Sequence, residues 1–214
     1  MSLYYPAFIN LKGKECVVVG GGRVAERKIA QLIKAGGLVK VISPAITEGL
    51  KKQKTKRKIV HIERKYRKGD LKGAFLVVAA TSDGKINQAV SQDAESLVNV
   101  VDQPALANFI VPSLISRGPL TIAVSTAGAS PALARAIREE LESSYPADVG
   151  QFLRFIKKMR EAALKDIPDK VLREAFLKKS ASRKTIEQLR SQGFKTVKNG
   201  IENSFNSLRR NALA

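Results

Sequence analysis

Three consecutive glycines follow a short apolar run near the start of the chain, and they limit its possible folds more than any other feature. Residues 16–28 read CVVVGGGRVAERK, so Gly20, Gly21 and Gly22 stand where a buried strand would end. Residues 15–19 predict a strand, and residues 24–35 predict a helix because their apolar residues recur at helical spacing. A strand, a glycine-rich turn and a helix in this order predict the opening unit of a doubly wound α/β sheet.

The spacing of the small residues in this turn is that of dinucleotide-binding proteins. Gly20, Gly22 and Ala25 fit the pattern G-x-G-x-x-A. In such a turn the first glycine permits a tight bend, the second lets a diphosphate reach the backbone, and the third small residue lets the helix pack closely on the sheet. The N–H groups that begin the helix then bind the phosphates. The alternative is a glycine-rich turn in an α/β domain that binds no nucleotide.

Further strand and helix patterns alternate up to about residue 111. Residues 38–42, 75–80 and 97–102 predict strands, residues 59–62 predict a short edge strand, and residues 86–94 lie on one predicted helix. This alternation predicts a Rossmann-type parallel sheet. An acidic residue about 20 positions after the glycines usually holds the adenosine ribose. The second strand instead ends in Ser43, Pro44 and Ala45, of which Ser43 can hydrogen-bond a ribose hydroxyl, so the pattern does not distinguish NAD from NADP.

The pattern changes after residue 109. Residues 120–125 predict a strand, and Ser130 and Pro131 predict a helix start, as N-cap and first helical residue. Leu133, Ile137 and Leu141 mark the predicted buried stripe of that helix. Beyond residue 145 only amphipathic helices are predicted. We therefore expect an α/β domain at residues 1–111, a middle section at residues 112–145 and a helical domain at residues 146–214.

The charge of the chain is strongly positive, with 38 Lys and Arg against 19 Asp and Glu. Such a charge attracts polyanions, so the partner can be nucleic acid, an anionic membrane or a substrate rich in carboxylates or phosphates. The alternative is a solvated basic surface with no specific partner. Residues 51–68 hold ten basic residues but only one aromatic residue, Tyr66, which disfavours single-stranded nucleic acid. No apolar run is long enough to span a membrane and no secretory signal is recognisable, so a cytoplasmic protein is expected. One cysteine and one histidine, His61, predict no metal site.

With these residues assembled, the chain resembles the precorrin-2 dehydrogenase family, the NAD-dependent part of siroheme synthases. The resemblance rests on five segments in order: VVVGGGRVAERK, VISP, AATSD…N, NVVDQP…FIVPS and VSTAGASPALARAIREELE. It implies a homodimer with a Rossmann domain, a dimerisation section at residues 112–145 and a helical domain. It further implies oxidation of precorrin-2 to sirohydrochlorin with NAD. Some members also insert ferrous iron, which would then be a transient partner.

The resemblance and the residues together select candidate site residues. The resemblance places the family's catalytic aspartate at Asp102 and a family serine at Thr126. The cofactor contacts fall on the glycine turn and the ends of three strands: Gly20, Gly21, Gly22, Arg23, Val24, Ser43, Pro44, Ala45 and Thr81. Ligands of open α/β sheets bind at the carboxyl ends of the strands, so Gly20, Thr81 and Asp102 are expected to converge, with Asp102 as the base.

The substrate carries acetate and propionate groups, for which we expect binding residues in the middle section. The loop at residues 126–130 precedes a helix, so its backbone N–H groups can bind a carboxylate. The candidates are Thr126, Gly128, Ser130, Arg135 and Arg138. Two other functions stay open at this stage: a non-catalytic NAD-sensing regulatory module, and nucleic-acid binding through residues 51–68.

Overall fold

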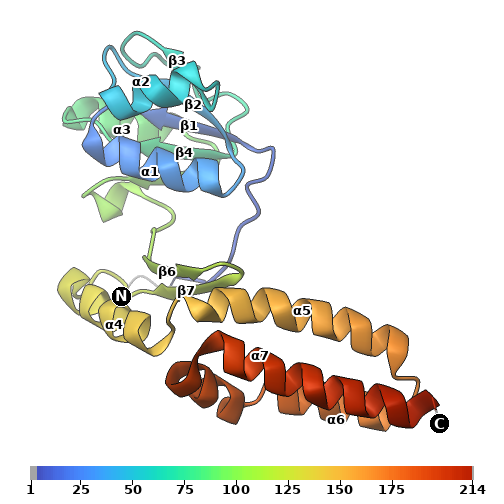
Figure 1. Cartoon of the computed structure of the whole chain (residues 1–214). Coiled ribbons are helices and arrows are strands. Elements are labelled where there is room, and N and C mark those ends of the chain that lie inside the picture. Colours follow the sequence, from blue (N-terminus) through green and yellow to red (C-terminus); the bar gives the residue numbers. More distant parts are fainter. Residues whose placement is uncertain (1–3, 214) are drawn as a thin grey trace. The chain divides into compact units, whose positions relative to one another are not determined.

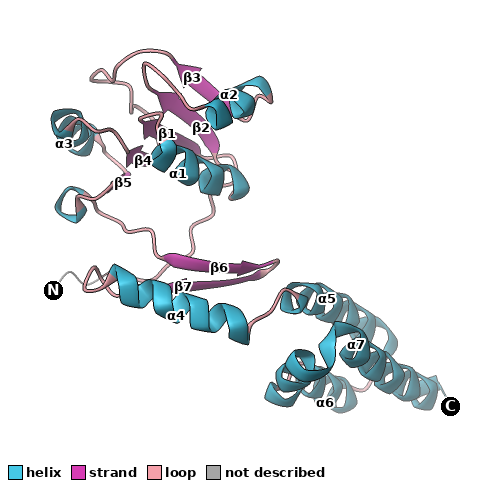
Figure 2. Ribbon diagram, turned by 60° about the vertical axis from the view of Figure 1, so that its left-hand side comes forward, coloured by secondary structure: helices cyan, strands magenta, loops and turns pink. Residues whose placement is uncertain are grey.

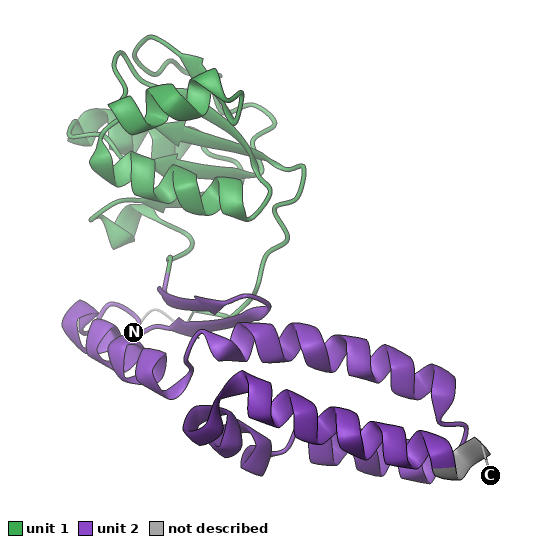
Figure 3. Cartoon of the chain, in the orientation of Figure 1, with its two compact units in different colours: residues 1–111 green, residues 112–214 purple. Residues whose placement is uncertain are grey.

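The chain forms two compact units, residues 1–111 and residues 112–214 (Figure 3). The computed structural model describes residues 4–213. The division of the second unit near residue 145 stays a prediction.

The first unit is built on a five-stranded parallel sheet (Figure 2). Its strands are β1 (Glu15–Val19), β2 (Leu38–Ile42), β3 (Ile59–Ile62), β4 (Leu76–Ala79) and β5 (Leu97–Val100), in the order β3-β2-β1-β4-β5. The connecting helices are α1 (Arg23–Lys34), α2 (Glu48–Thr55), α3 (Gly84–Asp93) and the short 3-10 helix η1 (Pro104–Leu106). The predicted Rossmann-type fold is confirmed, with β3 at the edge as expected.

Two apolar layers hold this sheet between its helices. Side chains alternate along a strand, so Cys16 and Val18 of β1 face one layer while Val17 and Val19 face the other. The first layer contains Ala25 and the other buried residues of α1, together with Leu50 of α2. The second contains Val90 of α3. Ala25 is fully buried, which confirms the close packing of α1 on the sheet that its small side chain predicts.

The strands end level with one another at their carboxyl ends. Val19 pairs with Ile42 on one side and with Ala79 on the other, and Ala79 pairs with Val100. Parallel strands in this register bring the residues that follow them to one edge of the sheet. The loops after β1, β2, β4 and β5 therefore start side by side.

The second unit begins with a two-stranded antiparallel sheet, formed by β6 (Ser113–Arg117) and β7 (Leu120–Val124). It continues with α4 (Pro131–Ser144), α5 (Asp148–Asp166), α6 (Lys170–Ser180) and α7 (Arg183–Leu213) (Figure 1). Gly193 interrupts α7 with a left-handed φ of 75°. The second part of α7 starts with Phe194, whose N–H donates to the Asp148 carboxylate at 3.2 Å.

Two elements were not predicted, and one predicted side-chain position needs correction. Helix α2 was not expected within the lysine-rich stretch, and β6 was not expected within the proline-punctuated segment. Leu133 was predicted to be buried, but its exposed fraction is 53% because α4 turns Ala134 inward instead.

Candidate dinucleotide-binding site

The three glycines serve three different purposes. Gly20 has a φ of 120°, and a Cβ added there would collide with the backbone of Ala80 after β4. A Cβ on Gly21 would collide with the carbonyl oxygen of Ala45 in the loop after β2. A Cβ on Gly22 would meet nothing within 4 Å. The first two glycines are thus required by the packing of the protein itself, whereas Gly22 leaves open space beside the backbone.

Open space at Gly22 lies at the beginning of α1. Gly22 is the N-cap residue of this helix and supplies no side-chain cap. The Glu26 N–H donates to the Gly22 carbonyl at 2.9 Å, as the first hydrogen bond of the helix. The N–H groups that precede Glu26 have no partner within the helix, and they carry the positive end of its dipole. Backbone donors, positive potential and open space together fit a diphosphate.

A pocket of about 630 Å³ extends from the glycine turn across the carboxyl edge of the sheet. Its volume lies in the range of small-molecule sites. The candidate cofactor residues that line it are Gly20, Gly21, Gly22, Ser43, Pro44, Ala45 and Thr81. Arg23 and Val24 follow the turn on α1 and are not part of this lining.

The hydroxyl groups of Ser43 and Thr81 are already engaged within the protein. Ser43 is buried and donates to the Ala45 carbonyl at 2.7 Å. Thr81 donates to the buried side-chain carbonyl of Asn87 at 2.8 Å, and Asn87 donates back to the Thr81 carbonyl at 3.1 Å. Both hydroxyls therefore keep only lone pairs for a ligand, and their first effect is to shape the two loops.

The pocket also contains residues that the sequence did not indicate. Lys65 and Tyr66 line it from the segment after β3. The Tyr66 hydroxyl donates to the Asp93 carboxylate at 2.7 Å, and burial, together with this bond, raises the pKa of the phenol so that it stays protonated. The only sequence signal was Tyr66 itself, the single aromatic residue in a basic stretch.

Asp102 lies at the same edge of the sheet, one strand beyond the pocket lining. The Val101 N–H donates to the Ala79 carbonyl at 2.9 Å, which holds the end of β5 beside the end of β4. Asp102 follows with a left-handed φ of 60° and an exposed side chain.

Lys28 of α1, which the sequence did not indicate as a site residue, interacts electrostatically with this carboxylate. Burial lowers the pKa of the Lys28 ammonium and the neighbouring Arg27 lowers it further, while the charge of Asp102 acts in the opposite direction. The arrangement brings an exposed carboxylate to the sheet edge with a half-buried cation near it.

The candidate substrate loop lies in the second unit, between β7 and α4. Thr126 donates to the Ser130 carbonyl at 3.0 Å and accepts from the Ser130 N–H at 3.2 Å. Ala127 and Gly128 are both left-handed, with φ values of 51° and 88°. The Ser130 hydroxyl accepts from the Leu133 N–H at 3.1 Å, which confirms Ser130 as the N-cap of α4.

Arg135 and Arg138 are both paired with acids of their own helix. Arg135 donates to Glu139 at 2.8 Å, and Arg138 donates to Glu142 at 2.5 Å and to Glu139 at 3.2 Å. The side chain of Arg135 is 75% exposed. A substrate carboxylate would have to compete with these glutamates for either guanidinium.

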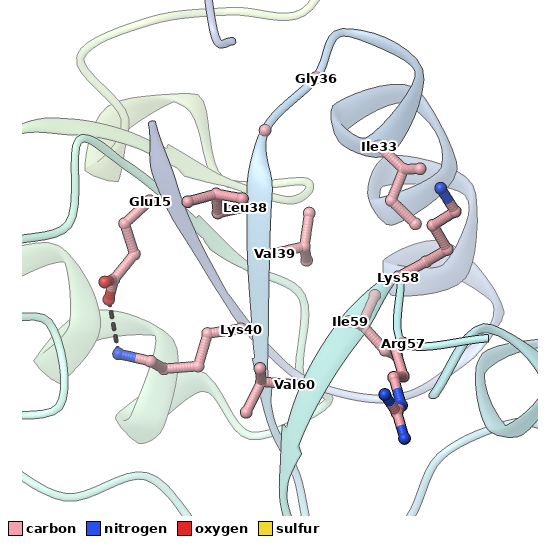
Figure 4. A pocket seen from close by; sticks show the side chains of 11 residues that line it. Glu15, Ile33, Gly36, Leu38, Val39, Lys40, Arg57, Lys58, Ile59 and Val60 are labelled. Atoms are coloured by element: carbon pink, nitrogen blue, oxygen red, sulfur yellow. Dashed lines mark hydrogen bonds and ion pairs between the residues drawn. The ribbon is translucent and has the colours of Figure 1, made fainter. Parts of the chain in front are cut away.

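A second pocket, of about 410 Å³, lies at the opposite, amino edge of β2 and β3 (Figure 4). Its floor is apolar, and the ion pair between Lys40 and Glu15, at 2.5 Å, forms part of its lining. Arg57 and Lys58 stand at its side. It contains neither a helix beginning nor the glycine turn, so the features that suit a dinucleotide belong to the carboxyl edge.

Comparison with known proteins agrees with this geometry. Residues 7–113 match a family described as putative NAD(P)-binding, and residues 117–144 match one described as sirohaem biosynthesis protein, central. The siroheme synthase of Methylobacillus flagellatus is 44% identical over 160 residues, which cover 73% of this chain and 34% of that protein. The siroheme synthase of Thioalkalivibrio sulfidiphilus is 43% identical over 176 residues, which cover 81% of this chain and 36% of that protein.

A solved structure, SirC, a precorrin-2 dehydrogenase, matches with a TM-score of 0.80 and 28% identity, over 94% of this chain and all of that one. The chain belongs to the siroheme synthase and precorrin-2 dehydrogenase family. It spans about a third of the length of the siroheme synthases that it matches. The second of the two family matches lies wholly within the second unit, so the similarity is not confined to the nucleotide-binding domain.

None of the helices within residues 4–213 is long and apolar enough to cross a membrane. No group of three or more His, Cys, Asp or Glu side chains in the same part of the chain is arranged to hold a metal ion.

Proposed function

We propose that this chain is an NAD-dependent precorrin-2 dehydrogenase, which oxidises precorrin-2 to sirohydrochlorin. The observation that carries the proposal is the open N-terminus of α1 at Gly22, beside a pocket at the carboxyl edge of a parallel sheet. The similarity to SirC over nearly the whole chain supports the tetrapyrrole as substrate.

The residues of the glycine turn and its neighbours would hold the cofactor. The N–H groups at the beginning of α1 bind the diphosphate, and the open space at Gly22 admits it. Pro44 and Ala45, which are exposed at the end of β2, support the adenosine half of the cofactor, and Arg23 and Val24 contact it from α1. When bound, the nicotinamide supplies the hydride acceptor that the side chains of the protein lack.

Asp102 would act as the base of the reaction. Oxidation of precorrin-2 removes a hydride and a proton, so the products are sirohydrochlorin, reduced NAD and one proton. Asp102 is an exposed carboxylate at the edge where the strands end, and it accepts this proton. Lys28 of α1 interacts electrostatically with this carboxylate and supplies a positive charge near the proposed base.

The substrate would be bound by the middle section and the charge of the protein. Thr126 and Ser130 shape the loop, because the Ser130 N–H already donates to the Thr126 hydroxyl. The Gly128 N–H and the positive end of the α4 dipole would then meet a substrate carboxylate. Arg135 and Arg138 lie on the same helix and would bind further carboxylates, which compete with Glu139 and Glu142 for their guanidinium groups. The excess of basic residues raises the local concentration of an anionic tetrapyrrole.

We also propose that the chain acts as a homodimer, as the resemblance implies, and that it works in the cytoplasm, as the sequence led us to expect. Two large apolar side chains of the middle section support an interface there: Leu114 of β6 is 38% exposed and Leu133 of α4 is 53% exposed. Burying such side chains against a second copy would stabilise the dimer. Analytical ultracentrifugation of the wild type and of Leu133→Asp tests this point, and a wild type that sediments as a monomer would contradict it.

The experiment that tests the activity mixes the purified chain with precorrin-2 and NAD. We expect the absorbance of reduced NAD and of sirohydrochlorin to rise together, in equal amounts. NADP is tested in parallel, because the end of β2 does not exclude it. A chain that binds NAD but neither binds nor oxidises the tetrapyrrole would overturn the proposal. Iron insertion stays a prediction, which a ferrous chelation assay on sirohydrochlorin tests.

A further inference from the structure

The wall of the cofactor pocket that faces the glycine turn is the loop between β2 and α2. Its residues 43–47 all line the pocket, opposite Gly20, Gly21 and Gly22. The loop packs directly on Gly21, because a Cβ there would collide with the Ala45 carbonyl and approach the Ser43 hydroxyl oxygen and the Ile46 side chain, each at 2.9 Å. The width of the pocket therefore depends on where this loop is held.

The beginning of the loop is fixed by the sheet. The Ser43 N–H donates to the Ile62 carbonyl at 3.2 Å, and His61 Nε2 donates to the Ser43 carbonyl at 2.9 Å. Both contacts come from the edge strand β3. The start of the wall thus needs nothing from α1.

The end of the loop is fixed by Thr47, whose N–H and hydroxyl make three hydrogen bonds to three different elements. Its N–H donates to the Gly21 carbonyl at 3.1 Å. Its hydroxyl donates to the Glu26 carboxylate at 2.6 Å and accepts from the Leu50 N–H at 3.2 Å, which caps α2. One residue therefore joins the glycine turn, the first helix and the second helix.

Glu26 is the partner that α1 supplies for this junction. It is half-buried on the first turn of α1, and its second carboxylate oxygen occupies the place that a side chain at Gly49 would need. Gly49 lies in the first turn of α2, where the positive end of the helix dipole favours an anion. The Glu26 carboxylate is thus held between the Thr47 hydroxyl and the beginning of α2.

We infer that Glu26 is a positioning residue for the dinucleotide, which holds the loop of residues 43–47 at the distance from the glycine turn that the cofactor needs. This inference rests on the proposed binding of NAD at the glycine turn. Glu26 itself does not line the pocket. It acts through Thr47, so the two side chains are expected to work as one unit. Loss of either side chain removes the link to α1 and loosens the end of the wall, which keeps the Thr47 N–H bond to the Gly21 carbonyl, while its start stays fixed to β3.

The test measures the affinity of NAD and of AMP by calorimetry for Glu26→Ala, Thr47→Val and the double variant. Losing a hydrogen bond to a charged group predicts about a tenfold rise in Kd for each single variant. The Kd of the double variant for NAD should be about equal to that of the single variant with the higher Kd, because both changes break the same hydrogen bond. AMP should lose affinity like NAD, since the loop faces the adenosine half.

Matched variants separate positioning from a general loss of stability. Glu48→Ala removes the same charge from the neighbouring helix, but Glu48 is exposed and forms an ion pair with Lys51. The Kd of this variant for NAD should therefore equal that of the wild type. Thr47→Ser and Glu26→Gln keep a donor and an acceptor and should restore affinity to within about threefold. The rate at saturating NAD should be unchanged in Glu26→Ala, while its KM for NAD rises.

The outcomes distinguish this inference from the proposed function. A wild-type chain without NAD affinity would overturn the proposed function. A wild type that binds NAD, with Glu26→Ala equal to it in affinity, would overturn the inference alone. The inference is also wrong if Glu48→Ala lowers the affinity for NAD as much as Glu26→Ala does. The loss would then come from the removed charge and not from the position of the loop.

Discussion

Replacing Gly22 by leucine is expected to remove NAD binding without unfolding the protein. Gly22 has a φ of −81° and a ψ of −176°, an extended conformation that any residue adopts. A Cβ there meets nothing within 4 Å, so the added side chain has room in the protein alone. That room is the space in which the diphosphate would lie against the N–H groups of α1.

The expected loss of affinity follows from the hydrogen bonds that leucine blocks. Hydrogen bonds to a charged group contribute about 1.5–3 kcal/mol each. Losing two of them to the diphosphate costs at least about 3 kcal/mol, which raises the Kd by about 100-fold or more. The cost to the fold is the N-cap preference of glycine over leucine, about 1 kcal/mol, which lowers Tm by about 2–4 °C in a chain of this size.

Isothermal calorimetry with NAD, together with thermal unfolding, measures both quantities. Gly84→Leu is the matched control, since Gly84 begins α3, also has open space at its Cβ and lies outside the pocket lining. The control should bind NAD like the wild type. If Gly22→Leu keeps wild-type affinity, the diphosphate does not lie at the beginning of α1, and the assignment of the cofactor site is refuted.

Three further outcomes are expected. Gly21→Ala should lower the free energy of unfolding in urea by about 1–3 kcal/mol, because its Cβ meets the Ala45 carbonyl, and an unchanged urea midpoint would contradict this. Asp102→Asn should lower kcat by about 10²–10⁴-fold while calorimetry shows unchanged NAD affinity, and normal turnover would exclude Asp102 as the base. Arg64 holds the pKa of Asp70 below its usual value through a hydrogen bond, so this pair stabilises the fold above the ordinary carboxyl pKa and its contribution is lost as the pH falls below about 4. In urea, the free energy of unfolding of Asp70→Asn should therefore be about 1 kcal/mol below that of the wild type at neutral pH and equal to it in acid. A difference that stays constant across pH would contradict the role of this ion pair.

The parts of the fold that the sequence predicts are those with strong local signals. Strand β1 is a continuous apolar run, and α1 carries buried residues at helical spacing between two glycine-rich turns. The same holds for β4, whose four residues are all buried. Each of these elements is specified by its own residues, so the β-α-β order and the Rossmann-type sheet follow from the sequence alone.

The elements that were missed bury too little of themselves to leave a periodic pattern. Helix α2 has eight residues, of which only Leu50 is buried and three are lysines. Strand β6 buries only Ile115, so its alternation is weak. At Leu133 the sequence predicted the wrong face of α4. Leu133 and Ala134 are both apolar and adjacent, so the pattern alone does not show which of the two turns inward.

Long-range contacts set a second limit on what the sequence can reveal about the site. The motif explains Gly20 and Gly22 by general rules, but the need for Gly21 comes from a carbonyl 24 residues further along the chain. Lys65 and Tyr66 reach the pocket only because β3 pairs beside β2. Such contacts exist only once the strands are in register, and no local pattern encodes them.

Thr47 shows both limits, the weak local signal of α2 and the dependence on a long-range contact. Thr47 follows a strand that the sequence predicts and caps a helix that it does not, and its hydroxyl reaches Glu26 across 21 positions. Glu26 comes directly after Ala25, the last residue of the G-x-G-x-x-A pattern, so the motif assigns it no role. The motif therefore specifies the surface that meets the diphosphate, whereas the distance of the opposite wall depends on residues outside the motif. Two chains with identical glycine turns can thus differ in cofactor affinity. In this chain we expect the hydrogen bond between Glu26 and Thr47 to adjust that affinity.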